Sequence, residues 1–198
     1  MPKSARSLSR ADILSLEDYA RLRADKRREM IAKKRKRRLA VGPYATVMFE
    51  SWDTMWYQVH EMLITEGGGE AQIADELAAY APLVPDGREL VATVMLEIED
   101  AARRERLLAQ LGGIEHLMHI RFDGEEVTGA PERDVDRSTP EGRTSSVHFL
   151  HFRMTPEQAS RFRTTDGPVI FAIEHPNYRH MAVIPPDILD EIRQDLAD

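Results

Sequence analysis

Cysteine is absent from this sequence of 198 residues. Without a thiol, the chain has no disulfide framework, no thiolate metal site, no cysteine nucleophile and no cysteine-ligated iron–sulfur cluster. Long apolar runs are missing too: no stretch approaches the roughly 20 residues that a membrane span needs. The charged segment from Met1 to Ala20 also lacks the apolar centre of a signal peptide. We therefore expect a cytoplasmic protein.

Several specific catalytic motifs are missing as well. Gly67-Gly68-Gly69 follows a predicted helix but lacks the lysine and hydroxyl of a phosphate-binding P-loop. No Gly-x-Gly-x-x-Gly follows a predicted strand, and neither a Gly-x-Ser-x-Gly elbow nor a His-Glu-x-x-His pair occurs. No reaction can therefore be named from a motif.

The composition suits one globular domain with a charged appendage. Hydrophobic residues make up 42% and charged residues 31%, which is close to the globular average and unlike disordered chains. Residues 1–40 hold 14 Lys and Arg against 5 Asp and Glu, whereas residues 41–198 carry a net charge of −16. We predict a basic helical N-terminal arm over residues 1–40 and a single α+β domain over residues 41–198.

Alternating apolar and polar residues predict a mixed, mainly antiparallel sheet of about six to seven strands with flanking helices. The expected strands cover residues 46–49, 90–98, 115–122, 125–130, 145–154, 169–175 and 178–184. Helices are expected over residues 16–38, from Asp53 to the three glycines, through Ile73, Leu77 and Tyr80, after Asp100 and Thr155, and from Pro186. Asp123-Gly124 predicts a two-residue hairpin, while Pro176-Asn177 predicts a second hairpin with a looser turn.

Histidines in the last strands indicate one candidate metal site. If His175 pairs with Tyr178, the period of two places His175 and His180 on one face of the second hairpin. His148 of strand 145–154 could add a third nitrogen, and Glu61 or Glu97 a carboxylate. Such a set suits iron, zinc or manganese. The alternative is that these histidines form hydrogen bonds with the backbone or with Tyr178 within the core. Alternation also places His151 and Arg153 on the opposite face of strand 145–154 from His148.

The basic arm has two interpretations. A nucleic-acid-binding regulator would use its cations to neutralise phosphates, with salt-dependent affinity. The residues concerned are Arg27, Arg28, Lys33, Lys34, Arg35, Lys36, Arg37 and Arg38. No aromatic residue interrupts this run, so the arm could instead lie against the acidic body of its own subunit or of a partner subunit.

Aromatic residues near the start of the second helix suggest a third function. Trp56, Tyr57 and Glu61 could line the pocket of an enzyme that acts on a small molecule. Aromatic clusters also form ordinary cores, so both interpretations stay open.

A set of short motifs gives the sequence a family resemblance. The motifs are Gly42-Pro43, Phe49-Glu50, Trp56-Tyr57-Gln58-Val59-His60-Glu61-Met62, Pro85-Asp86-Gly87, Ser146-Val147-His148-Phe149-Leu150 and His175-Pro176-Asn177-Tyr178-Arg179-His180. Together they resemble the uncharacterised bacterial domain-of-unknown-function family 3501 over nearly the whole chain. The chain departs from the family pattern at Gly67 to Gly69, where relatives tend to continue the helix.

The family offers no catalytic residues to carry over, but the resemblance implies a context. Members are often encoded beside rubrerythrin-like di-iron proteins and iron–sulfur oxidoreductases. The resemblance therefore implies an accessory protein of a bacterial redox or oxidative-stress system that acts through protein contacts, with such redox proteins as candidate partners. A homo-oligomer is a further candidate assembly.

Overall fold

The computed structural model describes residues 6–132 and 142–197. Its α-helices are α1 Leu16–Arg35, α2 Trp52–Glu66, α3 Gly69–Tyr80, α4 Ala101–Leu108, α5 Pro156–Thr164 and α6 Pro186–Ile192. Its strands are β1 Arg38–Val41, β2 Ala45–Phe49, β3 Glu89–Leu96, β4 Met118–Phe122, β5 Glu125–Thr128, β6 Ala130–Pro131, β7 Val147–Arg153, β8 Ile170–His175 and β9 Tyr178–Val183. Among the described helices, none combines the length and apolar character needed to cross a membrane.

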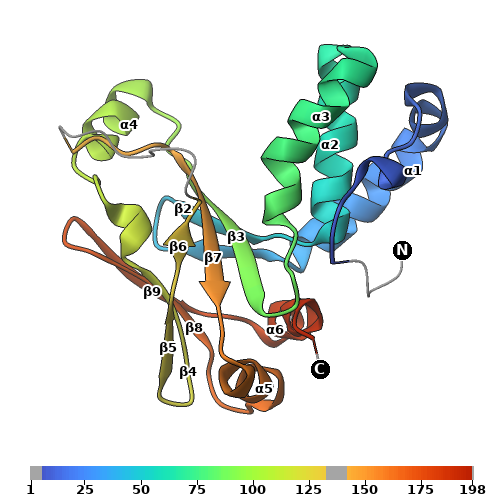
Figure 1. Cartoon of the computed structure of the whole chain (residues 1–198). Coiled ribbons are helices and arrows are strands. Elements are labelled where there is room, and N and C mark those ends of the chain that lie inside the picture. Colours follow the sequence, from blue (N-terminus) through green and yellow to red (C-terminus); the bar gives the residue numbers. More distant parts are fainter. Residues whose placement is uncertain (1–5, 133–141, 198) are drawn as a thin grey trace.

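The strands form two antiparallel sheets (Figure 1). Sheet A has the order β1-β2-β3-β7-β6, and sheet B has the order β5-β4-β8-β9. The predicted α+β class with mainly antiparallel strands is confirmed, with the strands divided between two sheets instead of joined in one.

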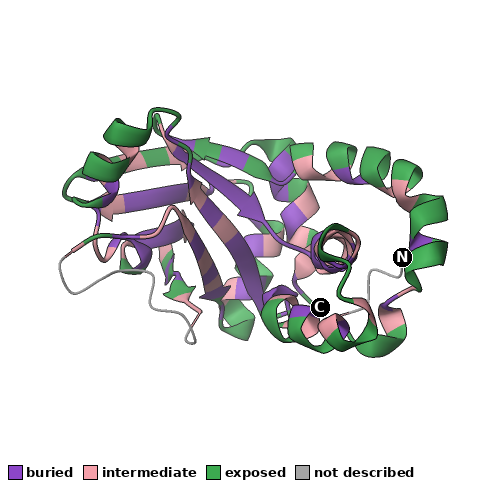
Figure 2. Cartoon of the chain, turned by 90° about the horizontal axis from the view of Figure 1, so that it is seen from above, coloured by how far each residue is buried: buried purple, intermediate pink, exposed green. Residues whose placement is uncertain are grey.

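The main core lies between the two sheets. Phe171 of sheet B has its ring centroid 6.3 Å from that of Phe49 and 5.6 Å from that of Phe152, both in sheet A. Figure 2 shows the buried residues gathered along the strands. Burying each such ring contributes about 1.5–3 kcal/mol, so this layer is a principal source of stability.

Tyr178 links the sheets by hydrogen bonds. Its hydroxyl, on β9, donates to the Val41 carbonyl at 2.7 Å and accepts from the N–H groups of Tyr44 and Ala45 at 3.0 and 2.9 Å. These partners flank the turn between β1 and β2. One buried hydroxyl therefore satisfies three backbone groups of the other sheet.

A second, smaller core joins helices α1, α2 and α3 to the opposite face of sheet A. Val91 packs there with Tyr19, Trp56 and Val59, whereas its neighbours Leu90 and Ala92 belong to the core between the sheets. Successive residues of a strand point to opposite faces, so β3 contributes to both cores. In Figure 1 the three helices stand together beside one end of sheet A.

Local sequence signals predicted most turns and caps. Asp123 and Gly124 both have positive φ, 47° and 79°, between β4 and β5, as the predicted hairpin requires. Gly67, with φ of 66°, ends α2, so the helix stops at the three glycines. His175 pairs with Tyr178, so the loop at Pro176-Asn177 is two residues long. The prediction of a looser turn at this hairpin is therefore wrong.

Three predicted boundaries are corrected. Helix α1 ends at Arg35 instead of residue 38, because Arg38 already pairs with Met48 as the first residue of β1. Ser51 caps α2 in place of Asp53, and its hydroxyl accepts from the N–H of Thr54. The strand predicted from residue 115 begins at Met118, after a 3₁₀ turn.

Arg37 is buried where the arm enters sheet A. Only 2% of its side chain is exposed, and its guanidinium makes two 2.8 Å contacts with the carboxylate of Asp195. It also donates to the carbonyl oxygen of Glu50 at 3.0 Å and lies 3.3 Å from Glu191. Burial opposes the charge, but the two carboxylates outweigh it and raise the pKa of Arg37.

Replacing Arg37 tests the structural importance of this buried pair. We expect Arg37→Met to lower the free energy of unfolding by about 3–5 kcal/mol, since Asp195 would keep a buried, unpaired charge. Arg38→Met is the matched control. Arg38 and Glu97 are 51% and 49% exposed, so its cost should stay below about 1 kcal/mol. Urea denaturation measures both, and equal costs would contradict the distinction.

Candidate functional site

The three histidines predicted to bind a metal are divided between the two sheets. His148 is in β7 of sheet A, fully buried, with Nε2 2.9 Å from the Ser145 carbonyl oxygen and 3.1 Å from the Thr144 hydroxyl. His175 and His180 belong to β8 and β9 of sheet B. The core hydrogen bonds of His148 match the alternative interpretation of this residue.

His175 and His180 share the face predicted for them. The register pairs His175 with Tyr178 and Ile173 with His180. His175 Nδ1 accepts from the N–H of Asn177 at 3.2 Å, and the His180 ring packs edge-on against Tyr178. Each ring therefore has its own local contact.

The two predicted carboxylate ligands are paired with arginines. Glu61 accepts from the Tyr19 hydroxyl at 2.8 Å and from Arg23 at 2.8 Å, and the hydrogen bond from Arg23 is the main reason that its pKa is lowered. Glu97 accepts from the Thr46 hydroxyl and from Arg38, and both contacts lower its pKa.

These five residues are not brought to one point. Within residues 6–132 and 142–197, no group of three or more histidine, aspartate or glutamate side chains is placed to hold a metal ion.

The basic arm lies against the acidic body of its own chain. Ion pairs between the described residues join them along the arm: Arg10 with Glu70, Arg23 with Glu61, Lys33 with Asp53 and Glu191, Arg37 with Glu191 and Asp195, and Arg38 with Glu97. Arg28 forms a further ion pair with Asp25 inside the arm. Four of the eight cations predicted to bind phosphate are thus in ion pairs within the chain: Arg28, Lys33, Arg37 and Arg38. This arrangement matches the interpretation in which the arm docks on its own subunit.

The other four cations of that set are placed differently. Lys34 lies 5.7 Å from the centroid of the Tyr57 ring. Arg27, Arg35 and Lys36 are exposed and make no ion pair with any residue that the structure describes.

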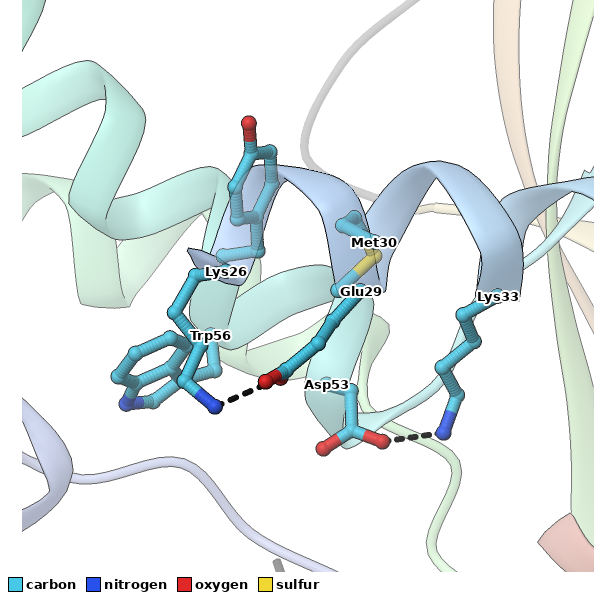
Figure 3. Close-up of a pocket in the computed structure, with 7 residues that line it drawn as sticks. Lys26, Glu29, Met30, Lys33, Asp53 and Trp56 are labelled. Carbon is cyan, nitrogen blue, oxygen red and sulfur yellow. Dashed lines mark hydrogen bonds and ion pairs between the residues drawn. The ribbon is translucent and has the colours of Figure 1, made fainter. Parts of the chain in front are cut away.

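Trp56 and Tyr57 line a small cavity between α1 and α2 (Figure 3). Its volume is about 120 Å³, and Met30 and Trp56 form its apolar part. Ion pairs of Lys26 with Glu29 and of Lys33 with Asp53 flank it. Glu61 does not line this cavity. Ligand sites for metabolite-sized molecules span roughly 300–1,000 Å³, so this cavity is small for such a role.

A larger cleft of about 610 Å³ lies at the start of β3, beside β6 and β7. Apolar residues form part of its wall, and charged residues form the rest. The apolar residues are Ala81, Pro82, Val84, Ala130 and Pro131, and the charged or titratable ones are Asp86, Glu89, Glu132, His151 and Arg153. Its volume lies in the range of sites for small molecules, and its lining is more polar than that of most such sites.

His151 lies between two carboxylates in this cleft. Its Nδ1 is 3.1 Å from Oε2 of Glu89, and its Nε2 is 2.8 Å from Oε2 of Glu132. The Glu89 side chain is 4% exposed and also contacts Nε of Arg153 at 3.3 Å, whereas Glu132 is 29% exposed. A buried carboxylate therefore holds one side of the ring and a more exposed one the other.

The surroundings of His151 favour its protonated form. The hydrogen bond to Glu89 has the largest effect and, with the one to Glu132, raises the pKa of His151 above its ordinary value, although burial opposes this. The geometry also favours the protonated ring. An ionised carboxylate can only accept hydrogen bonds, and a neutral imidazole has a single N–H to donate. Both contacts are hydrogen bonds only when the ring is an imidazolium.

Strand alternation predicted part of this site but not the site itself. It placed His151 and Arg153 on one face of the strand that became β7. Glu89 joins them because β3 pairs with β7, with Glu89 opposite Arg153 and Val91 opposite His151. Strand order cannot be read from periodicity, so Glu89 and Glu132 gave no signal as partners.

Removing one carboxylate tests the electrostatics of the cleft. We expect Glu132→Gln to lower the pKa of His151, measured by NMR titration of its ring and assigned with His151→Gln. Glu126→Gln is the matched control, because Glu126 lies 3.6 Å from His119 in sheet B instead. A pKa of His151 that is insensitive to Glu132→Gln would contradict the observed contacts.

The same contacts predict a dependence of stability on pH. The native pKa of His151 is raised, so the stability from its charge is fully present below about pH 6.5 and is lost as pH rises through the native pKa. The difference in unfolding free energy between wild type and His151→Gln should therefore shrink toward alkaline pH. Urea denaturation across the pH range measures it.

Comparison with solved structures identifies a close structural relative. A crystal structure at 1.90 Å of a novel protein of unknown function from Burkholderia pseudomallei is 36% identical in sequence, with a TM-score of 0.88. The match covers 96% of this chain and all of that one. No curated protein sequence matches significantly.

A family model also matches, and its description is "Protein of unknown function (DUF3501)". The match runs over residues 7–196, in agreement with the resemblance seen in the motifs. Because the model spans almost the whole sequence, the chain belongs to domain-of-unknown-function family 3501.

Proposed function

We propose that this protein binds a small polar molecule in the cleft beside β3, β6 and β7, and that His151 exchanges a proton with it. The observation that carries the proposal is the position of the His151 ring, with Glu89 on Nδ1 and Glu132 on Nε2 inside a cleft of about 610 Å³.

The two nitrogens of His151 have different roles in this proposal. Glu89 is buried and fixes the orientation of the ring through Nδ1, as the third group does in many acid–base sites. Glu132 is more exposed, so its contact with Nε2 is the one that a ligand can replace. Nε2 is therefore the atom that gives or takes the proton.

The cleft suits such a ligand in size and lining. Pro82 and Pro131 give it walls with restricted backbone freedom. The carboxylates and Arg153 supply polar groups that would orient a bound molecule. Because the imidazole is only 11% exposed, its proton exchange would be sheltered from bulk water.

The role as an accessory protein of a bacterial redox system, implied by the family resemblance, stays a prediction. So do the binding of iron, zinc or manganese and the binding of nucleic acid by the arm. Elemental analysis of untagged protein purified without chelators would test the metal, and salt-dependent binding to duplex DNA would test the arm.

Carbethoxylation with diethyl pyrocarbonate tests the cleft site, because the reagent modifies accessible neutral imidazoles. We expect His151 to react slowly near pH 7, with an apparent pKa above the ordinary histidine value, and to react faster in Glu132→Gln. Mass spectrometry of the peptide that contains His151 gives the rate.

Two controls accompany this measurement. His116 is 64% exposed and serves as the reference for free reaction, while Glu126→Gln should leave the rate at His151 unchanged. If His151 stays unmodified in both wild type and Glu132→Gln after His116 has reacted fully, small polar molecules do not reach the imidazole and the proposed function is lost.

A further inference from the structure

The cleft has more negative than positive groups. Three carboxylates line it, those of Asp86, Glu89 and Glu132, against the guanidinium of Arg153 and the imidazolium of His151. Its net charge is thus negative even with His151 protonated. The body over residues 41–198 has the same sign, so long-range attraction and the local site both favour a cation.

The existing contacts leave specific acceptors for a ligand. Glu89 is less accessible to a ligand, because its side chain is only 4% exposed and its Oε2 already contacts both His151 and, as an ion pair, Arg153. Glu132 uses only Oε2, toward His151, and Asp86 uses only Oδ1, which accepts from the N–H of Arg88 at 2.8 Å. Among the described residues, no partner contacts the second carboxylate oxygen of Glu132 or of Asp86.

The remaining wall suits a short aliphatic chain. Pro82, Val84, Ala130 and Pro131 line the same cleft as the two carboxylates. Methylene groups pack favourably on such surface while a charged head stays with its polar partners. An apolar wall beside free carboxylate oxygens therefore fits a molecule with an apolar stem and a cationic end.

We infer that the ligand of the cleft is a small organic cation, a primary ammonium on a short aliphatic stem, held by the carboxylates of Glu132 and Asp86. This inference rests on the proposed function and names the class of its ligand. The ammonium competes with His151 for Glu132, since both donate hydrogen bonds to that carboxylate.

Binding and protonation are therefore coupled. The groups facing His151 are Glu89 from β3, Glu132 after β6 and, through Glu89, Arg153 of β7. An ammonium bound at Glu132 repels the imidazolium, so it lowers the pKa of His151, and by reciprocity its affinity rises with pH. An anion at the same place would raise that pKa.

Three probes with the same stem test this: n-butylammonium, butyrate and n-butanol, titrated by NMR into the isotopically labelled full chain. We expect n-butylammonium alone to lower the pKa of His151 and to shift the resonances of Val84 and Ala130. Its affinity should rise roughly tenfold between about pH 5.5 and pH 8.5, a typical size for a coupling between two sites.

Variants locate the binding groups. Glu132→Gln and Asp86→Asn should each weaken n-butylammonium binding about tenfold, the usual loss for one charged hydrogen bond. Glu126→Gln is the control on sheet B and should bind like wild type.

The other outcomes separate this inference from the proposed function. Preferential binding of butyrate with a raised pKa of His151 would keep the cleft as a ligand site and overturn the cation. Failure of n-butylammonium to bind at millimolar concentration also overturns the cation, while the carbethoxylation of His151 decides independently whether the cleft admits small molecules.

Discussion

The ion pair of Arg37 with Asp195 holds together segments from opposite ends of the chain. Arg37 follows the basic helix, and its guanidinium reaches the carbonyl oxygen of Glu50 after β2 and the carboxylate of Asp195 after α6. A buried charge must keep every hydrogen bond that replaces water, because an unmet one costs several kcal/mol. One side chain therefore connects the arm, the end of the β1–β2 hairpin and the C-terminal segment.

The cleft depends on this framework indirectly, through sheet A. The hairpin of β1 and β2 forms one side of the sheet, β3 and β7 form its centre, and the short strand β6 ends it. His151 is paired on one side with Val91 of β3 and on the other with Ala130 of β6, and Glu89 pairs with Arg153 at the start of β3. Glu132 follows β6 at the edge. The ring of His151 is thus fixed from its buried side and adjustable from its exposed side, which is the arrangement that proton exchange with a ligand needs.

Local rules predicted the elements better than they predicted the site. The hairpin at Asp123-Gly124 was predictable because both positions need positive φ, and the shared face of His175 and His180 followed from the period of two in paired strands. The partnership of Glu89 with His151 joins residues 62 positions apart and depends on strand order, which no local pattern encodes. Arg37 was hidden for another reason: in a run of six cations, nothing distinguishes the one that is buried from those in water.

The burial of an ion pair constrains which substitutions its two positions accept within the family. The pair of Arg37 and Asp195 is only 2% and 10% exposed, whereas Arg38 and Glu97 are about half exposed. Water can solvate either member of the exposed pair after its partner is substituted, so we expect substitutions at those two positions to occur independently. Positions 37 and 195 are constrained, because the loss of one charge leaves the other buried without a partner. Across relatives, these two positions should change together or not at all, and their covariation would mark the junction between arm and body.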